Sequence, residues 1–114
     1  MCQSSSLEIL SSSPNGYIGK CDSCTKINVV FENIFILLEE KELKAISRVI
    51  DESYGIWMLE SYIGKGKKIT MQTPLPNLYF AFTVEEYEEL KRLINQAMLI
   101  IDARNILKQP LSQN

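Results

Sequence analysis

The chain carries the same strand-then-helix pattern twice, and this repetition constrains its fold more than any other feature. Residues 33–51 align without a gap with residues 77–95. Each copy opens with an apolar run, Ile34–Leu38 or Leu78–Phe82, and continues with apolar residues spaced three and four apart. A short apolar run followed by that spacing predicts a strand that enters an amphipathic helix. Unrelated strand–helix segments share this pattern, but the local prediction is the same in either case.

Extended segments are predicted in front of each copy. Residues 26–32 and 68–73 alternate apolar and polar side chains, and residues 17–20 and 56–63 also have an extended pattern. Each helix is therefore predicted to follow a hairpin. We predict an α+β fold in which an antiparallel sheet of about five or six strands carries two helices on one face.

The length of the chain fits one domain. Its 114 residues would leave two domains with too little core each. We predict a flexible, serine-rich N-terminus over residues 1–14, a single α+β domain over residues 15–108 and a flexible tail over residues 109–114. Within the domain, the duplicated strand–strand–helix unit covers residues 26–51 and 70–95.

The starts of the two helices differ in the strength of their capping signals. Thr83 and Glu86 have the spacing of a capping box, which predicts that the second helix begins directly after Thr83. Glu39 and Glu40 precede the first helix, where their charges suit a helix N-terminus. Asn33 is predicted to mark a tight turn between two strands.

The apolar runs of the chain are short. A run such as residues 97–101 falls far below the roughly 20 residues that a membrane-spanning helix needs. The N-terminus lacks the basic start and apolar stretch of a secretory signal. An odd number of cysteines, three, fits a disulfide framework poorly. These features predict a cytoplasmic protein with reduced thiols.

The composition offers few parts for catalysis. The sequence contains no histidine, which removes the usual general base and the commonest metal ligand. Its glutamates fall on predicted helix starts and helix surfaces, where they ordinarily face solvent. A formal net charge of −2 gives no overall positive charge to attract phosphate backbones. We therefore expect a binding protein rather than an enzyme.

Cys21-Asp-Ser-Cys24 is the one motif with chemistry of its own. Cysteines at this spacing hold zinc from a turn, or act as a redox pair at a helix N-terminus. A strand is predicted after Cys24, which favours a zinc-binding turn over a thioredoxin-like pair. A closed zinc site needs four ligands, so Cys2 or a second chain would have to complete it. Two buried, inert thiols remain the simplest alternative.

The turn that begins at Gly64 holds the basic cluster Lys65, Lys67 and Lys68, with Tyr62 nearby. Lysines beside an aromatic ring could contact phosphate or a nucleic-acid strand. The same composition is typical of an ordinary hairpin turn. Nucleic-acid or phosphate binding through Lys65–Lys68 is therefore a minor hypothesis.

The C-terminal helix carries more apolar surface than one small sheet can bury. Its first stripe consists of Tyr87, Leu90, Ile94, Ala97 and Ile101. Leu93, Ile100 and Leu107 form a second stripe at seven-residue spacing. A long helix within a single core would also explain this pattern, but two stripes favour a symmetric homodimer through Leu93, Ile100 and Leu107.

Two segments of the chain, Asn15–Asn33 with the C-x-x-C and Pro76–Leu90, resemble a family of small uncharacterised bacterial proteins that share an N-terminal C-x-x-C before a strand. The resemblance covers most of the chain and implies a single domain. The family has no established activity, so the resemblance implies no functional residue.

The leading hypothesis is a small, non-enzymatic, cytoplasmic homodimer that binds a protein partner, with Cys21 and Cys24 as candidate ligands of a structural zinc. One alternative is a thiol-dependent redox enzyme that uses the same two cysteines. The other is nucleic-acid or phosphate binding through the turn Lys65–Lys68.

Overall fold

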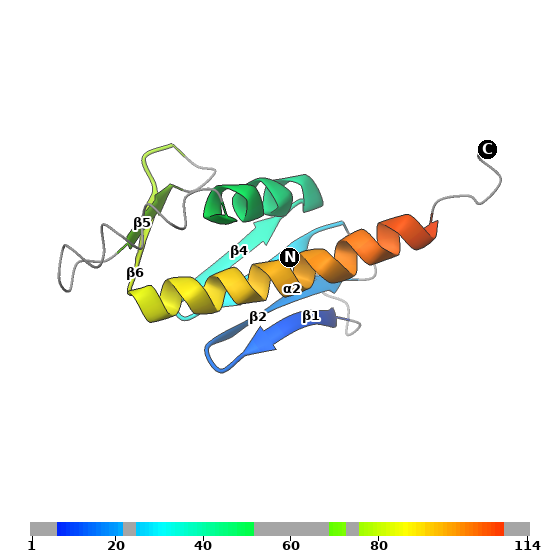
Figure 1. Ribbon diagram of the computed structural model, residues 1–114, viewed down its shortest axis with the longest axis horizontal. Helices are drawn as coiled ribbons and strands as arrows, with labels where there is room; N and C mark the ends of the chain where they lie inside the picture. Colours follow the sequence, from blue (N-terminus) through cyan, green and yellow to red (C-terminus); the bar gives the residue numbers. More distant parts are fainter. Residues whose placement is uncertain (1–6, 22–24, 52–68, 73–75, 109–114) are drawn as a thin grey trace.

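The protein has an α+β fold, as predicted (Figure 1). The structure, a computed structural model, describes residues 7–21, 25–51, 69–72 and 76–108. Four strands come first in the chain and a helix over residues 40–51, the first helix, follows them. Two short strands and the long helix α2 complete the described part. The bounds are β1 Leu7–Ser13, β2 Gly16–Cys21, β3 Ile27–Phe31, β4 Ile34–Leu38, β5 Ile69–Gln72, β6 Tyr79–Phe82 and α2 Val84–Lys108.

The strands of the described part form two sheets, where the sequence predicted one. Strands β1 to β4 make an antiparallel meander in chain order, and β5 pairs only with β6. Phe82 of β6 packs edge to face on Phe31 of β3, with ring centroids 5.9 Å apart. The second hairpin therefore joins the core through side chains and does not extend the main sheet. The strand predicted over residues 56–63 lies outside the described residues.

The prediction of a flexible N-terminus over residues 1–14 was wrong for residues 7–13, which form β1. A bulge between Ile9 and Ser11 shifts the pairing of β1 with β2. Leu10 is 4% exposed and lies in the core, and the Ser11 hydroxyl donates a 2.8 Å hydrogen bond to the Leu93 carbonyl. The serine-rich sequence hid this strand, because the partner that satisfies the buried Ser11 hydroxyl lies on α2, far along the chain.

Tight turns set the register of the meander. Phe31 pairs with Ile34, so Glu32 and Asn33 make the turn between β3 and β4, as predicted from Asn33. Glu32 adopts the left-handed conformation with φ of 53°, and its amide donates to the Asn15 carbonyl. Gly16 faces β3 so closely that a Cβ there would lie 2.2 Å from a backbone oxygen. Only glycine fits this position without opening the sheet.

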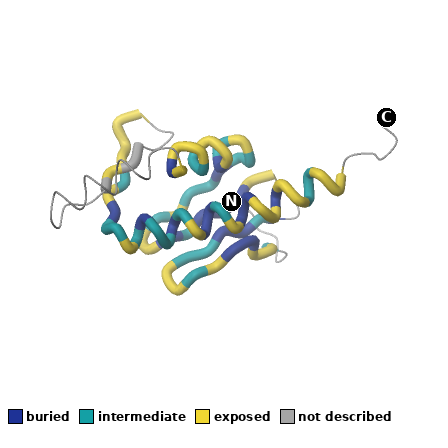
Figure 2. The backbone as a smooth tube through the Cα atoms, viewed as in Figure 1, coloured by how far each residue is buried: buried dark blue, intermediate teal, exposed yellow. Residues whose placement is uncertain are grey.

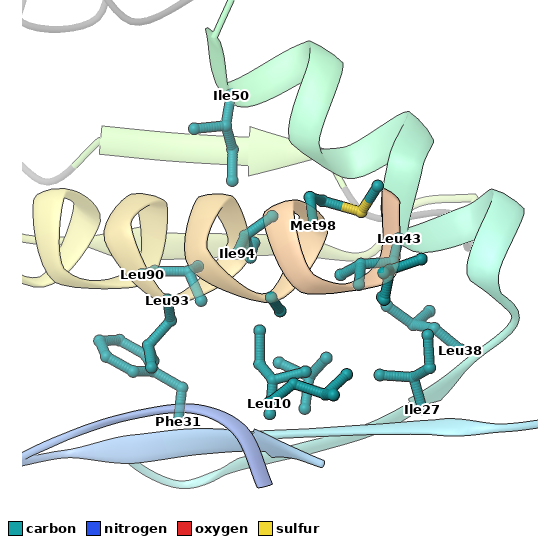
Figure 3. Close-up of a cluster of buried hydrophobic side chains, with 14 of the residues drawn as sticks. Leu10, Ile27, Phe31, Leu38, Leu43, Ile50, Leu90, Leu93, Ile94 and Met98 are labelled. Atoms are coloured by element: carbon teal, nitrogen blue, oxygen red, sulfur yellow. The ribbon is translucent and has the colours of Figure 1, made fainter. Parts of the chain in front are cut away.

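Both helices cover the same face of the main sheet, as predicted. The core between them contains apolar side chains of β1, β2, β3, β4, the first helix and α2 (Figure 3). It includes Leu10, Ile27, Phe31, Leu38, Leu43, Ile50, Leu90, Leu93, Ile94 and Met98. The main sheet therefore has one face covered by helices, and α2 crosses that face with its C-terminal turns extending past the first helix (Figure 1).

The start of α2 has the predicted capping box. The Thr83 amide donates to the Glu86 carboxylate at 2.9 Å, and the Glu86 amide donates to the Thr83 hydroxyl at 3.1 Å. This is a complete capping box. At the first helix, the Glu39 amide donates to the Glu42 carboxylate at 2.7 Å, which is one half of the same arrangement.

Candidate functional site

Helix α2 is held to the sheet by one continuous buried face. This face consists of Tyr87, Leu90, Leu93, Ile94, Ala97, Met98 and Ile101. The Tyr87 hydroxyl is buried and donates a 2.9 Å hydrogen bond to the Ile50 carbonyl of the first helix. Leu93 is 1% exposed, so it belongs to this core face and not to a dimer surface. The predicted stripe through Leu93, Ile100 and Leu107 was therefore wrong at Leu93.

Polar contacts on α2 fix how far the helix can rotate. Near its start, the Glu89 carboxylate accepts hydrogen bonds from the Ser13 hydroxyl and from the backbone and side-chain amides of Asn15. These hydrogen bonds lower the pKa of the Glu89 carboxyl, and the bond from Ser13 has the largest effect. Near its end, Arg104 forms a bidentate ion pair with Glu8 of β1, which lowers the pKa of the Glu8 carboxyl.

The contacts at the C-terminal turns leave the opposite side of α2 uncovered. The Asn105 amide donates to the Glu40 carboxylate of the first helix at 2.7 Å, whereas Arg104, one position earlier, pairs with Glu8 of β1, so both contacts go to elements that pack against α2. Most residues after Ile101 are exposed (Figure 2). The described chain therefore holds the helix from one side only in this region.

An apolar stripe follows the uncovered side of these turns, and we call it the outward stripe. Leu99 is 70% exposed, Ile106 66% and Leu107 82%, while Ile100 is 37% exposed. Ala103 lies at the centre and is also exposed. With 3.6 residues per turn, the five positions span about 120° of the helix circumference. Exposed apolar patches of this kind mark interaction surfaces in proteins.

The outward side of α2 is polar in the N-terminal half of the helix and apolar in the C-terminal part. In the N-terminal half the same side carries Glu85, Glu88, Arg92 and Gln96. From Leu99 onward it carries no charged or polar residue. An ordinary exposed helix face would remain polar to its end. The change therefore sets the outward stripe apart as a surface of its own.

Ile100 and Leu107 of this surface were predicted from the sequence, whereas Leu99 and Ile106 were not. The signal was present, because residues 97–101 are apolar without interruption. A helical pattern shows which residues share a side, but it does not show which of two neighbouring apolar sides meets the sheet. The structure decides this through the buried face of α2.

A second apolar surface lies on the face of the main sheet that the helices leave open. Tyr17, Val30 and Phe35 are neighbours across three strands, and Phe35 is 50% exposed. Asn28 lies on the same face, 7% exposed, and its side-chain oxygen has no hydrogen-bond partner. Tyr17 and Val30 are half-buried, so this patch offers less exposed area than the outward stripe.

The pocket between the main sheet and the two helices has only apolar lining. Its walls include Val29, Ile36, Leu43, Phe80 and Ile94. Such a lining offers no polar group to orient a ligand, which binding sites ordinarily provide. The pocket is therefore part of the core.

Cys21 is the only cysteine among the described residues. It ends β2, is 1% exposed and is disulfide-bonded. Cys2 and Cys24 lie outside the described residues. Because zinc binds the thiolate, a zinc site at Cys21 and Cys24 would require the reduced chain. Among the described residues, no three histidine, cysteine, aspartate or glutamate side chains form a group that could hold a metal ion.

The remaining predicted residues also lie outside the described part. Lys65, Lys67 and Lys68 of the basic turn are in the range 52–68, and the predicted tail covers residues 109–114. Within the ranges that are described, no helix has the length and apolar character to cross a membrane.

A family of unknown function, DUF6686, matches residues 1–109. The chain belongs to this family. Membership of DUF6686 agrees with the resemblance to an uncharacterised family and gives no activity to transfer. No curated protein and no solved structure matches the chain.

Proposed function

We propose that this member of DUF6686 is a non-enzymatic interaction module that acts as a homodimer through the C-terminal part of α2. The observation that carries the proposal is the outward stripe, where Leu99, Ile106 and Leu107 are each at least 66% exposed. Exposing large apolar side chains to water is unfavourable by roughly 1.5–3 kcal/mol each compared with full burial. A protein surface that covers them would recover part of that free energy. The same dimer would present its remaining surfaces to a protein partner.

The lack of histidine in the sequence supports a non-enzymatic role. The buried, disulfide-bonded Cys21 gives some support to the alternative of thiol-dependent redox chemistry with Cys24. Its 1% exposure argues against direct attack by a substrate. Structural zinc at the C-x-x-C and phosphate binding at Lys65–Lys68 remain predictions.

The cytoplasmic location predicted from the sequence also remains a proposal.

The test is the mass of the protein in solution, measured by size-exclusion chromatography with light scattering over a range of concentrations. The wild type is expected to approach twice the chain mass of 13.0 kDa as the concentration rises. The double variant Leu99→Ser, Leu107→Ser is expected to stay monomeric and folded. Val49→Ser is the matched control, because Val49 is an exposed apolar residue on the other helix. A wild type that remains monomeric, or a control that dissociates equally, would overturn the proposal.

A further inference from the structure

The residue types of the outward stripe are arranged symmetrically about Ala103 along the helix. Leu99 and Ile100 precede Ala103 by four and three residues, and Leu107 and Ile106 follow it by the same intervals. A dimer with two-fold symmetry brings one surface patch against an identical copy of itself. For two antiparallel helices, a stripe that is symmetric about its midpoint meets such a copy with matching residue types throughout.

We infer that two copies of this chain pair their α2 helices antiparallel, with Ala103 on the two-fold axis. This inference rests on the proposed homodimer and assigns its geometry. Leu99 then lies level with the partner's Leu107 along the helix pair, and Ile100 lies level with the partner's Ile106. Ala103 faces the partner's Ala103, and its small side chain lets the helices approach closely at the crossing point.

The charges on the outward side favour this direction over a parallel pair. In a parallel pair, Glu85, Glu88 and Arg92 would each approach the same residue of the partner, and like charges in such positions destabilise an interface. In the antiparallel pair Met98 lies opposite the partner's Lys108, where α2 ends. The charged N-terminal half then has no helix of the partner opposite it.

The arrangement also separates the two folded bodies. The sheet packs against the side of α2 that bears Tyr87 to Ile101, and the C-terminal turns extend past the first helix (Figure 1). An antiparallel crossing at Ala103 places the two bodies at opposite ends of the helix pair. The outward stripes can therefore meet without a clash between the two sheets.

The exposed area is sufficient for a specific contact. The four large side chains of the stripe are 37% to 82% exposed. Together they expose on the order of 500 Å² per protomer, so complete burial of all four in both protomers would remove about 1,000 Å² from water, which is near the lower limit for a specific interface. The expected dimer is therefore a modest one that forms as the concentration rises.

Cysteine cross-linking in the full-length protein tests the geometry. Ala103→Cys is compared with Asp102→Cys, because residue 102 is exposed beside the stripe but points about 100° away from its centre. Disulfides require Cα atoms within about 7 Å, so only the cysteine at position 103 is expected to bridge two chains. Mass spectrometry of tryptic peptides identifies the 103–103 bridge, since peptide 93–104 of the wild type contains no cysteine.

The expected result is at least a tenfold faster cross-link for Ala103→Cys than for Asp102→Cys. A second experiment distinguishes the direction of the helices. Leu99→Cys mixed with Leu107→Cys is expected to form 99–107 bridges, while neither variant bridges to itself. Self-bridging of Leu99→Cys, or equal rates at positions 102 and 103, would overturn the antiparallel geometry. If light scattering still shows a dimer in that case, the proposed function stands; a protein that never dimerises refutes both.

Discussion

Leu93 and Leu107 are the same residue type on the same helix, and the structure predicts opposite consequences for replacing them with alanine. Leu93 is 1% exposed in the core, whereas Leu107 is 82% exposed. Removing a buried leucine side chain leaves a cavity and costs about 2–5 kcal/mol. An exposed site away from the core changes the stability of the monomer by no more than about 0.5 kcal/mol.

Urea denaturation followed by circular dichroism measures this difference. It is performed at a concentration low enough to keep the chain monomeric, because dimerisation would add its own stabilisation. With a denaturant slope of about 1–3 kcal/mol/M, Leu93→Ala is expected to lower the unfolding midpoint by roughly 1 M or more. Leu107→Ala is expected to leave the midpoint unchanged within the error.

The outcome bears directly on which side of α2 meets the sheet. Comparable losses for Leu93→Ala and Leu107→Ala would contradict the packing described above, as would a loss below about 1 kcal/mol for Leu93→Ala. At concentrations where the wild type dimerises, Leu107→Ala is expected to have the larger direct effect on self-association. Leu107→Ala then weakens the dimer, while Leu93→Ala affects it only through the stability of the fold.

Four further predictions rest on other contacts. Glu89→Gln is expected to lower the free energy of unfolding by about 1 kcal/mol at pH 7. Because the pKa of Glu89 is lowered in the folded state, this stabilisation is present above the ordinary carboxylate pKa and is lost as the pH falls through the lowered value. A difference between Glu89→Gln and the wild type that does not shrink as the pH falls would contradict the reasoning. Tyr87→Phe leaves the buried Ile50 carbonyl without its partner and should cost about 1–2 kcal/mol in urea denaturation; an unchanged midpoint would show that the bond contributes nothing. Gly16→Ala should cost about 1–3 kcal/mol or more, because its Cβ would collide with the backbone of β3, and a neutral effect would refute that contact. Alkylation of the denatured, unreduced chain should modify one cysteine of the three if Cys21 has its partner within the same chain; modification of all three would exclude the disulfide.

The state of Cys21 differs from the one predicted from the sequence, because a local pattern does not show which cysteines meet in space. The sequence predicted reduced thiols, with zinc or inert burial as alternatives, from an odd cysteine count and a C-x-x-C spacing. Cys21 is buried at the end of β2 and disulfide-bonded. Which sulfurs meet depends on where the chain places them in space, and spacing along the sequence carries no such information.

In the main sheet, some elements can be predicted from alternating side chains and turn residues, and others cannot. The strands β3 and β4, the turn between them and the capping box at Thr83 are all local, because the residues that specify each lie within a few positions of one another. Strand β1 is different, since its serines gain their hydrogen bonds from α2 far along the chain. Its pairing is a tertiary effect, and the sequence predicted a flexible segment there.

The sequence by itself determined the elements whose signals are local: the α+β class, most strand positions, the two helix starts and the excess of apolar surface on the C-terminal helix. Only the tertiary structure decided which part of that apolar surface is buried against the sheet and which part stays exposed. Leu93 and Leu107 are equivalent in a helical pattern, but the sheet covers the first and leaves the second exposed, and the contacts of Arg104 and Asn105 hold the helix in that rotation. Burial depends on which elements lie opposite, and that choice is made by the packing of the whole chain.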